Sequence, residues 1–208
     1  MIDLKRVMLT PADKEDWLSM RESDITSTQS PALFGLSPYS TKFELYHAKR
    51  GDYTSEFKSN DRVAWGLRLE SSIAQGAAED HGWEIEPLKD YGRIPDARIG
   101  SSFDFRILSP ASEAGLLEVK NIDRFVFNDG WVLDSGQIEA PPHIELQAQH
   151  EMLVSGDDRI TIAGLVGGND LKLIRREADE EVQNLILEKV AEFWESVSKA
   201  EEPSPLFP

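Results

Sequence analysis

The sequence predicts an α/β protein built on a mixed β-sheet. Helical segments come first, a cluster of strand-like segments follows, and one helix, two more strands and a final helix complete the chain. This order is typical of a sheet packed against helices. The chain has 208 residues, of which 40% are hydrophobic, and this is enough for one compact domain with a sizeable core.

The composition excludes several classes of protein. The chain contains no cysteine, so disulfides and thiolate zinc sites are excluded. Its N-terminus is not that of a signal peptide, and no apolar run approaches the roughly 18 residues needed to span a membrane. We therefore expect a cytoplasmic protein with no membrane contact, with a single domain over residues 1–200 and an acidic, proline-rich tail over residues 201–208.

The net charge of −16 argues by itself against a nucleic-acid-binding protein, because phosphate binding favours lysine and arginine. The charge is unevenly distributed, however. Much of the acid lies in the last third of the chain, whereas basic residues recur between residues 42 and 106. Acids that bind a metal also behave differently, since the bound cation reverses the local sign. The distribution therefore permits a DNA-facing side and an acidic back.

The first 51 residues predict two helices with clear start signals and a shorter helix between them. Thr10 is suited to cap the first helix, with Pro11 at its first position. Thr41 and Glu44 form a capping box at the start of the second. Gly51 can adopt the left-handed conformation that ends this second helix.

A turn rich in hydroxyl groups connects the two helices. Arg21 precedes Ser27, Thr28 and Ser30, and a short helix follows. A helix N-terminus dense in serine and threonine, with an arginine nearby, can hold a phosphate. Ordinary capping is the alternative, and the residue pattern alone favours it.

Residues 63–81 predict a longer helix that ends at Gly82. Its apolar residues recur at helical spacing on one face, and Glu70 lies on that face among them. A carboxylate on a buried face needs a partner or a metal. An ion pair with an arginine and a metal site remain equally open at this stage.

The second half of the chain predicts most of the sheet. Gly156 closes one helix, Asp179 caps the last helix, and the run Gly167–Asp170 is a strong hairpin signal. We expect strands at 83–87, 98–107, 115–120, 159–166 and 171–175, a long connection at 121–143, and helices at 144–154 and from 179 onward.

Two neighbouring strands carry residues with catalytic chemistry. Side chains alternate faces along a strand, so Glu118 and Lys120 project from one side while Leu117 and Val119 point into a core. If this strand pairs with the preceding one, Asp104 reaches the same spot. Hard divalent cations such as Mg²⁺ prefer oxygen ligands of this kind, and a lysine beside them can orient or deprotonate a metal-bound water. The set therefore indicates phosphodiester hydrolysis.

The four residues Glu70, Asp104, Glu118 and Lys120 follow the order helix acid, strand acid, strand Glu-x-Lys. This order and spacing resemble the PD-(D/E)xK nuclease superfamily. A wider set of blocks resembles the YqaJ-like viral recombinase family, which includes the phage lambda exonuclease. The similarity covers roughly residues 10–197, and the blocks that carry it are residues 25–28, 34–39, 65–70, 117–120 and 146–152.

The resemblance implies a restriction-endonuclease-like core, in which a central mixed β-sheet is flanked by helices. It also implies a 5′-to-3′ exonuclease that acts on double-stranded DNA ends with Mg²⁺, or alternatively Mn²⁺, as cofactor. The 3′ single-stranded tails would be handed to a single-strand annealing protein, and members of this kind form homotrimers around the duplex. Carried over by position, Asp104, Glu118 and the Val119 carbonyl bind metal, Glu70 helps to hold the site, Lys120 orients the attacking water, Gln147 lies near the scissile phosphate, and Arg21 and Thr28, with Ser27 and Ser30 beside them, form a 5′-phosphate pocket.

The chain departs from the family at one point. The family usually has Ser-Pro-Asp-Gly around the strand acid, whereas residues 102–105 here read Ser-Phe-Asp-Phe. Two alternatives remain: a nuclease of the same superfamily that acts on single strands or on particular structures, and an inactive binding module of the same fold. The retention of all four site residues argues against the inactive module. A zinc hydrolase is disfavoured because the histidines include no close-spaced pair.

Overall fold

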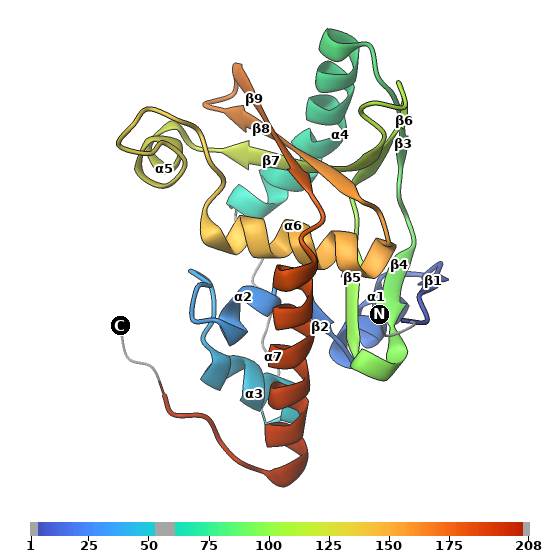
Figure 1. Ribbon diagram of the computed structural model, residues 1–208, viewed down its shortest axis with the longest axis vertical. Helices are drawn as coiled ribbons and strands as arrows, with labels where there is room; N and C mark the ends of the chain where they lie inside the picture. The colour runs from blue at the N-terminus through green and yellow to red at the C-terminus, as the bar shows by residue number, and fades with distance from the viewer. Residues whose placement is uncertain (1–3, 53–60, 206–208) are drawn as a thin grey trace.

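The computed structural model describes residues 4–52 and 61–205, and it contains two mixed β-sheets with helices around them (Figure 1). Within these ranges no helix is long and apolar enough to cross a membrane. Residues 201–205 of the predicted tail form neither helix nor strand, and residues 206–208 lie outside the described residues. The helices are α1 (Lys14–Glu22), α2 (Ser30–Leu33), α3 (Lys42–Arg50), α4 (Asp61–His81), α5 (Arg124–Gly130), α6 (Pro142–Ser155) and α7 (Glu180–Lys199), with a 3₁₀ turn at Pro95–Ala97; the strands are β1 (Val7–Leu9), β2 (Ile25–Thr26), β3 (Glu84–Pro87), β4 (Tyr91–Ile94), β5 (Ile99–Ser102), β6 (Phe105–Ser109), β7 (Gly115–Ile122), β8 (Arg159–Val166) and β9 (Asp170–Glu177).

The larger sheet has the strand order β3-β6-β7-β8-β9 and confirms the predicted mixed sheet. β7 and β8 run parallel, and the other neighbours are antiparallel. α4 covers one face, where Ile73 and Ala77 pack with Leu117 and Val119 of β7. The prediction that Leu117 and Val119 point into a core is therefore confirmed. α6 covers the opposite face.

α6 lies between the two sheets and is buried on every side. It contacts β8 of the larger sheet and β4 and β5 of the smaller one, and α7 packs against it (Figure 1). Every residue of the run 146–154 is buried. The polar members of this run must therefore find partners inside the protein, because a buried polar group without a hydrogen bond is costly.

The smaller sheet, with the order β1-β4-β5-β2, was not foreseen from the sequence. β1 has three residues and β2 has two, which is too short for an alternating pattern to be recognised. β2 runs parallel to β5, with Ile25 opposite Ile99 and Thr26 opposite Gly100. This pairing fixes the hydroxyl-rich turn against the centre of the molecule.

The prediction of one continuous strand over residues 98–107 is wrong. The segment forms β5 in the smaller sheet and β6 in the larger sheet, and Phe103 and Asp104 lie between them. Phe103 is buried in the core, so the inward alternation continues across the break. For this reason the hydrophobic pattern does not reveal that the chain changes sheets. Asp104 consequently lies at the junction of the two sheets.

The predicted start of the first helix is also wrong. α1 begins at Lys14, and the Asp13 carboxylate caps it by accepting from the Asp16 N–H at 2.9 Å. The Thr10 hydroxyl instead donates to Asp90 Oδ1 at 2.6 Å, because the residues before it form β1. The predicted capping box at Thr41 and Glu44, the left-handed glycines at 51, 82 and 156, the hairpin at Gly167–Asp170 and the Asp179 cap are confirmed.

Gly100 of β5 has no room for a side chain. An added Cβ would overlap the Tyr91 hydroxyl and lie 2.9 Å from Asp24 Oδ2, and both of these groups are buried. We expect Gly100→Ala to lower the free energy of unfolding by about 2–3 kcal/mol. Gly76→Ala on α4 is the control, because no atom lies within 4 Å of its added Cβ. It should raise the same quantity by up to about 1 kcal/mol. Urea unfolding measures both, and equal effects would contradict this account.

Candidate active site

β7 places Glu118 and Lys120 on the face of the larger sheet that α6 covers. Lys120 Nζ lies 2.5 Å from Glu118 Oε1. Glu118 is 5% exposed, so the ion pair is formed in the interior. Burial acts to lower the pKa of Lys120, but the charge and hydrogen bond of Glu118, together with the charges of Asp104 and Glu151, hold that pKa above its ordinary value. Lys120 therefore remains a cation in the site.

Gln147 of α6 connects the two charged residues. Its Oε1 accepts from Lys120 Nζ at 3.2 Å, and its Nε2 donates to Glu118 Oε1 at 2.8 Å. The three side chains thus form a closed triangle of hydrogen bonds. The arrangement brings together three of the residues that the sequence predicted for the site.

Asp104 reaches the same region from the junction of the sheets. Its Oδ2 accepts from the Val119 main-chain N–H at 2.8 Å. β6 pairs with β7 so that Phe105 lies opposite Leu117, and this register holds Asp104 beside Val119. Burial raises the pKa of Asp104 well above its usual range, and the charges of Glu118 and Glu70 raise it further. Asp104 is therefore close enough to these acids to sense their charge.

Glu70 belongs to α4 and faces the same cluster. Burial raises its pKa, the charge of Glu118 raises it further, and Lys120 opposes both. Within the described part of the chain, no arginine forms an ion pair with Glu70. Of the two explanations for a carboxylate on this helix face, the arginine pair is therefore not supported.

The acids of this cluster have the donor chemistry of a site for a hard divalent cation. Glu118 raises the pKa of both Glu70 and Asp104, and Lys120 is the cation that opposes this repulsion. A bound metal would relieve the repulsion further, and carboxylates are the ligands that Mg²⁺ prefers. Among residues 4–52 and 61–205, no three His, Asp or Glu side chains already surround one point as ligands.

Glu151 is a site residue that the sequence reasoning missed. It lies one turn beyond Gln147 on α6, and its Oε1 accepts from Gln147 Nε2 at 2.9 Å. Burial raises the pKa of Glu151 well above its usual range, and the charge of Glu118 raises it further. The spacing of Gln147 and Glu151, four residues apart on a helix, was the available signal.

His150 is a buried imidazole on the same helix. Its Nε2 lies 3.2 Å from the Gly100 carbonyl oxygen, and burial lowers its pKa to about 4. Unfolded histidine has a pKa of about 6.5, so the unfolded chain takes up a proton that the folded protein rejects, and stability is lost as pH falls from about 6.5 to 4. We expect His150→Gln to remove about 2 kcal/mol of the fall in unfolding free energy between about pH 7 and 5. Urea unfolding at both pH values measures this, and an unchanged fall would contradict it.

The residues predicted to bind a 5′-phosphate lie around β2, and they differ in accessibility. The Thr28 side chain is exposed, and its hydroxyl oxygen lies 3.2 Å from that of Thr26. Ser27 and Ser30 are buried: the Ser27 hydroxyl is 2.8 Å from that of Ser101, and the Ser30 hydroxyl donates to the Ser27 carbonyl. α2 is only four residues long. The two serines thus serve the fold in this structure.

Arg21, at the end of α1, completes the predicted phosphate set. Its guanidinium stacks on Trp17, 4.4 Å from the ring centroid. No carboxylate pairs with it among the residues that the structure describes. Lys49 Nζ donates to the carbonyls of Arg21 and Asp24, and so fixes the turn that carries this arginine. Burial, and then the charge of Arg21, lowers the pKa of Lys49 to about 8.

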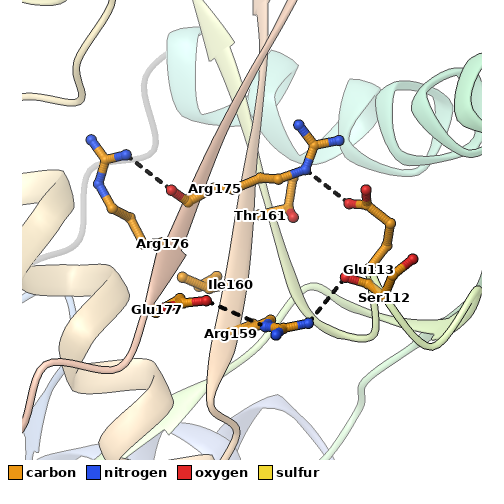
Figure 2. Close-up of a pocket in the computed structure, with 8 residues that line it drawn as sticks. All are labelled: Ser112, Glu113, Arg159, Ile160, Thr161, Arg175, Arg176 and Glu177. Atoms are coloured by element: carbon orange, nitrogen blue, oxygen red, sulfur yellow. Dashed lines mark hydrogen bonds and ion pairs between the residues drawn. The ribbon is translucent and has the colours of Figure 1, made fainter.

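A cavity of about 430 Å³ lies beside Arg159 and Arg175, and Figure 2 shows the residues that line it. Lys120 is opposite Gly164, whereas the cavity is at the other end of β8, around Arg159. Its charges are already paired, since Arg175 Nε lies 2.8 Å from Glu113 Oε2. The candidate active site is therefore the acid and lysine cluster rather than this cavity, which is lined by Ser112, Glu113, Arg159, Ile160, Thr161, Arg175, Arg176 and Glu177.

The sequence of this chain is similar to YqaJ-like proteins in two separate comparisons. The family model described as the YqaJ-like viral recombinase domain matches residues 16–158. The chain is also 26% identical, over 184 residues, to an uncharacterised protein YqaJ of Bacillus subtilis (strain 168). This match includes 87% of the chain but 55% of the relative, so the chain spans about half the length of that protein.

Comparison with solved structures supports the fold. An alkaline exonuclease, LHK-Exo from Laribacter hongkongensis, has a TM-score of 0.73 and 16% identity, over 90% of this chain and 94% of that one. The same enzyme in complex with dAMP has a TM-score of 0.72 and 18% identity. A phage-related exonuclease from Haemophilus somnus 129PT has a TM-score of 0.54 and 13% identity, over 91% of this chain and 88% of that one.

Proposed function

Because this chain belongs to the family of YqaJ-like viral recombinase domains, we propose that it is a metal-dependent 5′-to-3′ exonuclease that acts on double-stranded DNA. The observation that carries the proposal is the convergence of Glu70, Asp104 and Glu118 with Lys120 in one partly buried cluster. Such a cluster has little value for stability, because buried acids that repel each other are costly. It is suited to bind a cation and a phosphate.

Each residue of the cluster has a role in this proposal. Glu70, Asp104, Glu118 and the Val119 carbonyl would hold Mg²⁺, or alternatively Mn²⁺. A bound divalent cation supplies Lewis-acid activation of water and stabilises the leaving oxygen. Lys120 orients the attacking water and offsets the negative charge that grows on the phosphate. Gln147 holds Lys120 in place and lies near the scissile phosphate.

The partners of the enzyme are part of the same proposal. Duplex DNA ends are the substrate, and the 3′ single-stranded tails pass to a single-strand annealing protein. The protein acts as a homotrimer around the duplex. The neighbour LHK-Exo has been solved in complex with dAMP, which supports nucleotide binding as a property to test in this chain. The net charge of −16 predicts that this chain binds DNA less tightly than a basic protein would, because phosphate binding favours lysine and arginine.

Digestion of a linear duplex tests the proposal. One strand carries a 5′-phosphate, and the reaction contains Mg²⁺ or EDTA. We expect metal-dependent loss of the phosphorylated strand and a long 3′ tail on the other. Absence of cleavage with Mg²⁺ and with Mn²⁺, by a folded protein that binds DNA, would favour an inactive binding module. Faster digestion of single-stranded or nicked DNA than of blunt duplexes would indicate a different nuclease specificity.

The 5′-phosphate pocket makes a separate prediction. We propose that Arg21 and Thr28 contact the terminal phosphate, with Ser27 and Ser30 supporting the turn. Arg21→Gln should reduce the preference for 5′-phosphorylated over 5′-hydroxyl ends by about tenfold or more, because a charge-assisted contact is lost. Lys14→Gln removes a positive charge from the exposed side of the same helix and is the control. The ratio of initial rates on the two ends measures the preference, and an equal ratio in both variants would exclude this role.

A further inference from the structure

Glu151 is difficult to explain as a contribution to the fold. It is 2% exposed and lies on a helix that is buried on every side. Its hydrogen bond to the Gln147 amide is a single neutral donor against the cost of burying a carboxyl group. A well-packed apolar residue of similar volume would be expected to stabilise this position at least as well. Glu151 is therefore better explained by its effect on the orientation of the Gln147 amide.

The amide of Gln147 is held by three groups, and their chemistry allows only one orientation. Its Nε2 donates to Glu118 Oε1 at 2.8 Å and to Glu151 Oε1 at 2.9 Å, and its Oε1 accepts from Lys120 Nζ at 3.2 Å. A flipped amide would bring its N–H groups to the ammonium and its oxygen to the Glu118 carboxylate, and both of these contacts would be repulsive. Glu151 thus accepts the second amide hydrogen, which Glu118 alone leaves free.

We propose that Glu151 is a positioning residue of the active site, which locks the Gln147 amide so that its oxygen holds Lys120 against Glu118. The inference rests on the proposed nuclease function of this cluster. Glu151 acts through Gln147 and not by contact with the reacting atoms. Burial, and then the charge of Glu118, raises the pKa of Glu151, and a protonated carboxyl still offers an accepting oxygen. The role therefore needs an acceptor and does not need a charge.

Two substitutions of Glu151 separate these requirements. Glu151→Gln keeps an acceptor and should leave kcat on duplex DNA within about threefold of the wild type. Glu151→Met has similar volume and no comparable acceptor, and it should lower kcat at least about tenfold with little change in KM. Its melting temperature should not fall below that of the wild type, because a costly buried acid is removed.

Gln149→Met is the matched control. Gln149 is buried on the same helix, but its amide bonds to the Glu177 carbonyl and the Asp179 N–H, away from the cluster. Its loss should lower the melting temperature and leave kcat unchanged. If Glu151→Met also lowers stability and leaves kcat unchanged, Glu151 is structural and the proposal is wrong.

A double-substitution cycle tests whether Glu151 acts through Gln147. Gln147→Met alone should lower kcat by at least as much as Glu151→Met. The combined variant should be no slower than Gln147→Met, because there is no longer an amide for Glu151 to hold. Additive losses would show an independent role for Glu151 and overturn the proposal.

A readout without activity separates this inference from the proposed function. In the NMR spectrum of the wild type, both side-chain N–H signals of Gln147 should be shifted and should exchange slowly with water. Glu151→Met should abolish this protection for one of the two hydrogens, whereas Glu151→Gln and Gln149→Met should preserve it. Unprotected Gln147 signals in the wild type would refute the lock. A protected amide in a protein that cleaves no DNA would instead refute the nuclease function and leave the lock intact.

Discussion

Glu118→Gln is expected to abolish cleavage while the protein remains folded. The substitution keeps the size of the side chain and an oxygen that can accept from Gln147, so the packing of β7 against α6 should survive. It removes the central charge of the cluster, the one that raises the pKa of Glu70, Asp104 and Glu151. Metal binding and charge stabilisation are worth several kcal/mol in such sites, so we expect a loss of about a thousandfold or more.

The measurement compares the rate of digestion of the 5′-phosphorylated duplex at saturating Mg²⁺, with circular dichroism as the check on folding. Glu192→Gln is the matched control, since it makes the same chemical change on the surface of α7, where the carboxylate pairs with Lys189. The control should keep full activity. If Glu118→Gln and Glu192→Gln digest DNA at the same rate, the cluster is not the active site.

Lys120→Met should be as severe for cleavage and should also weaken the fold. The ammonium is the cation of the cluster, and its removal leaves Glu118 as a buried acid without its ion-pair partner. Breaking a buried pair in this way costs about 3–5 kcal/mol. In Lys120→Met the repulsion among the acids is no longer reduced by the lysine, and bound Mg²⁺ would take over this role. Mg²⁺ should therefore raise the melting temperature of Lys120→Met more than that of the wild type.

The variant Lys120→Arg separates the effect of the charge from the effect of the shape of the side chain. Lys120→Arg retains the charge and should recover the stability better than the activity, because a planar guanidinium does not reproduce a point charge between Glu118 and Gln147. Calorimetry with and without Mg²⁺ measures the stability, and the duplex assay measures the activity. Lys120→Met with wild-type cleavage would exclude the proposed role of the lysine.

The acids and the lysine of the site could be predicted because they depend on local rules. Alternation along a strand fixes which side Glu118 and Lys120 share, whatever the neighbours of that strand are. The short connection between β6 and β7 leaves an antiparallel pair as the simplest arrangement, and this pair brings Asp104 to Val119. The caps at Thr41 and Asp179 depend on local rules in the same sense, and the structure confirms these two caps.

The smaller sheet and Glu151 could not be predicted, because they depend on contacts far apart in the chain. β2 pairs with a strand some 70 residues further on, and two residues carry no periodicity. α6 is buried all round, so its sequence shows no apolar stripe that would identify the face opposite β7. The spacing of four residues makes Gln147 and Glu151 neighbours on the helix, but that this pair faces Glu118 of β7 depends on how the two sheets enclose α6.

The chain around Phe103 and Asp104 connects the two proposed binding sites, the 5′-phosphate turn and the metal site, over a short distance. The hydroxyl-rich turn is bonded to β5 through Ser27 and Ser101, and Asp104 follows only three residues later on the same extended chain. That stretch spans roughly 10 Å, since an extended residue advances about 3.3 Å. The turn that carries the proposed 5′-phosphate residues and the proposed metal ligand Asp104 are therefore spaced by a short covalent connection.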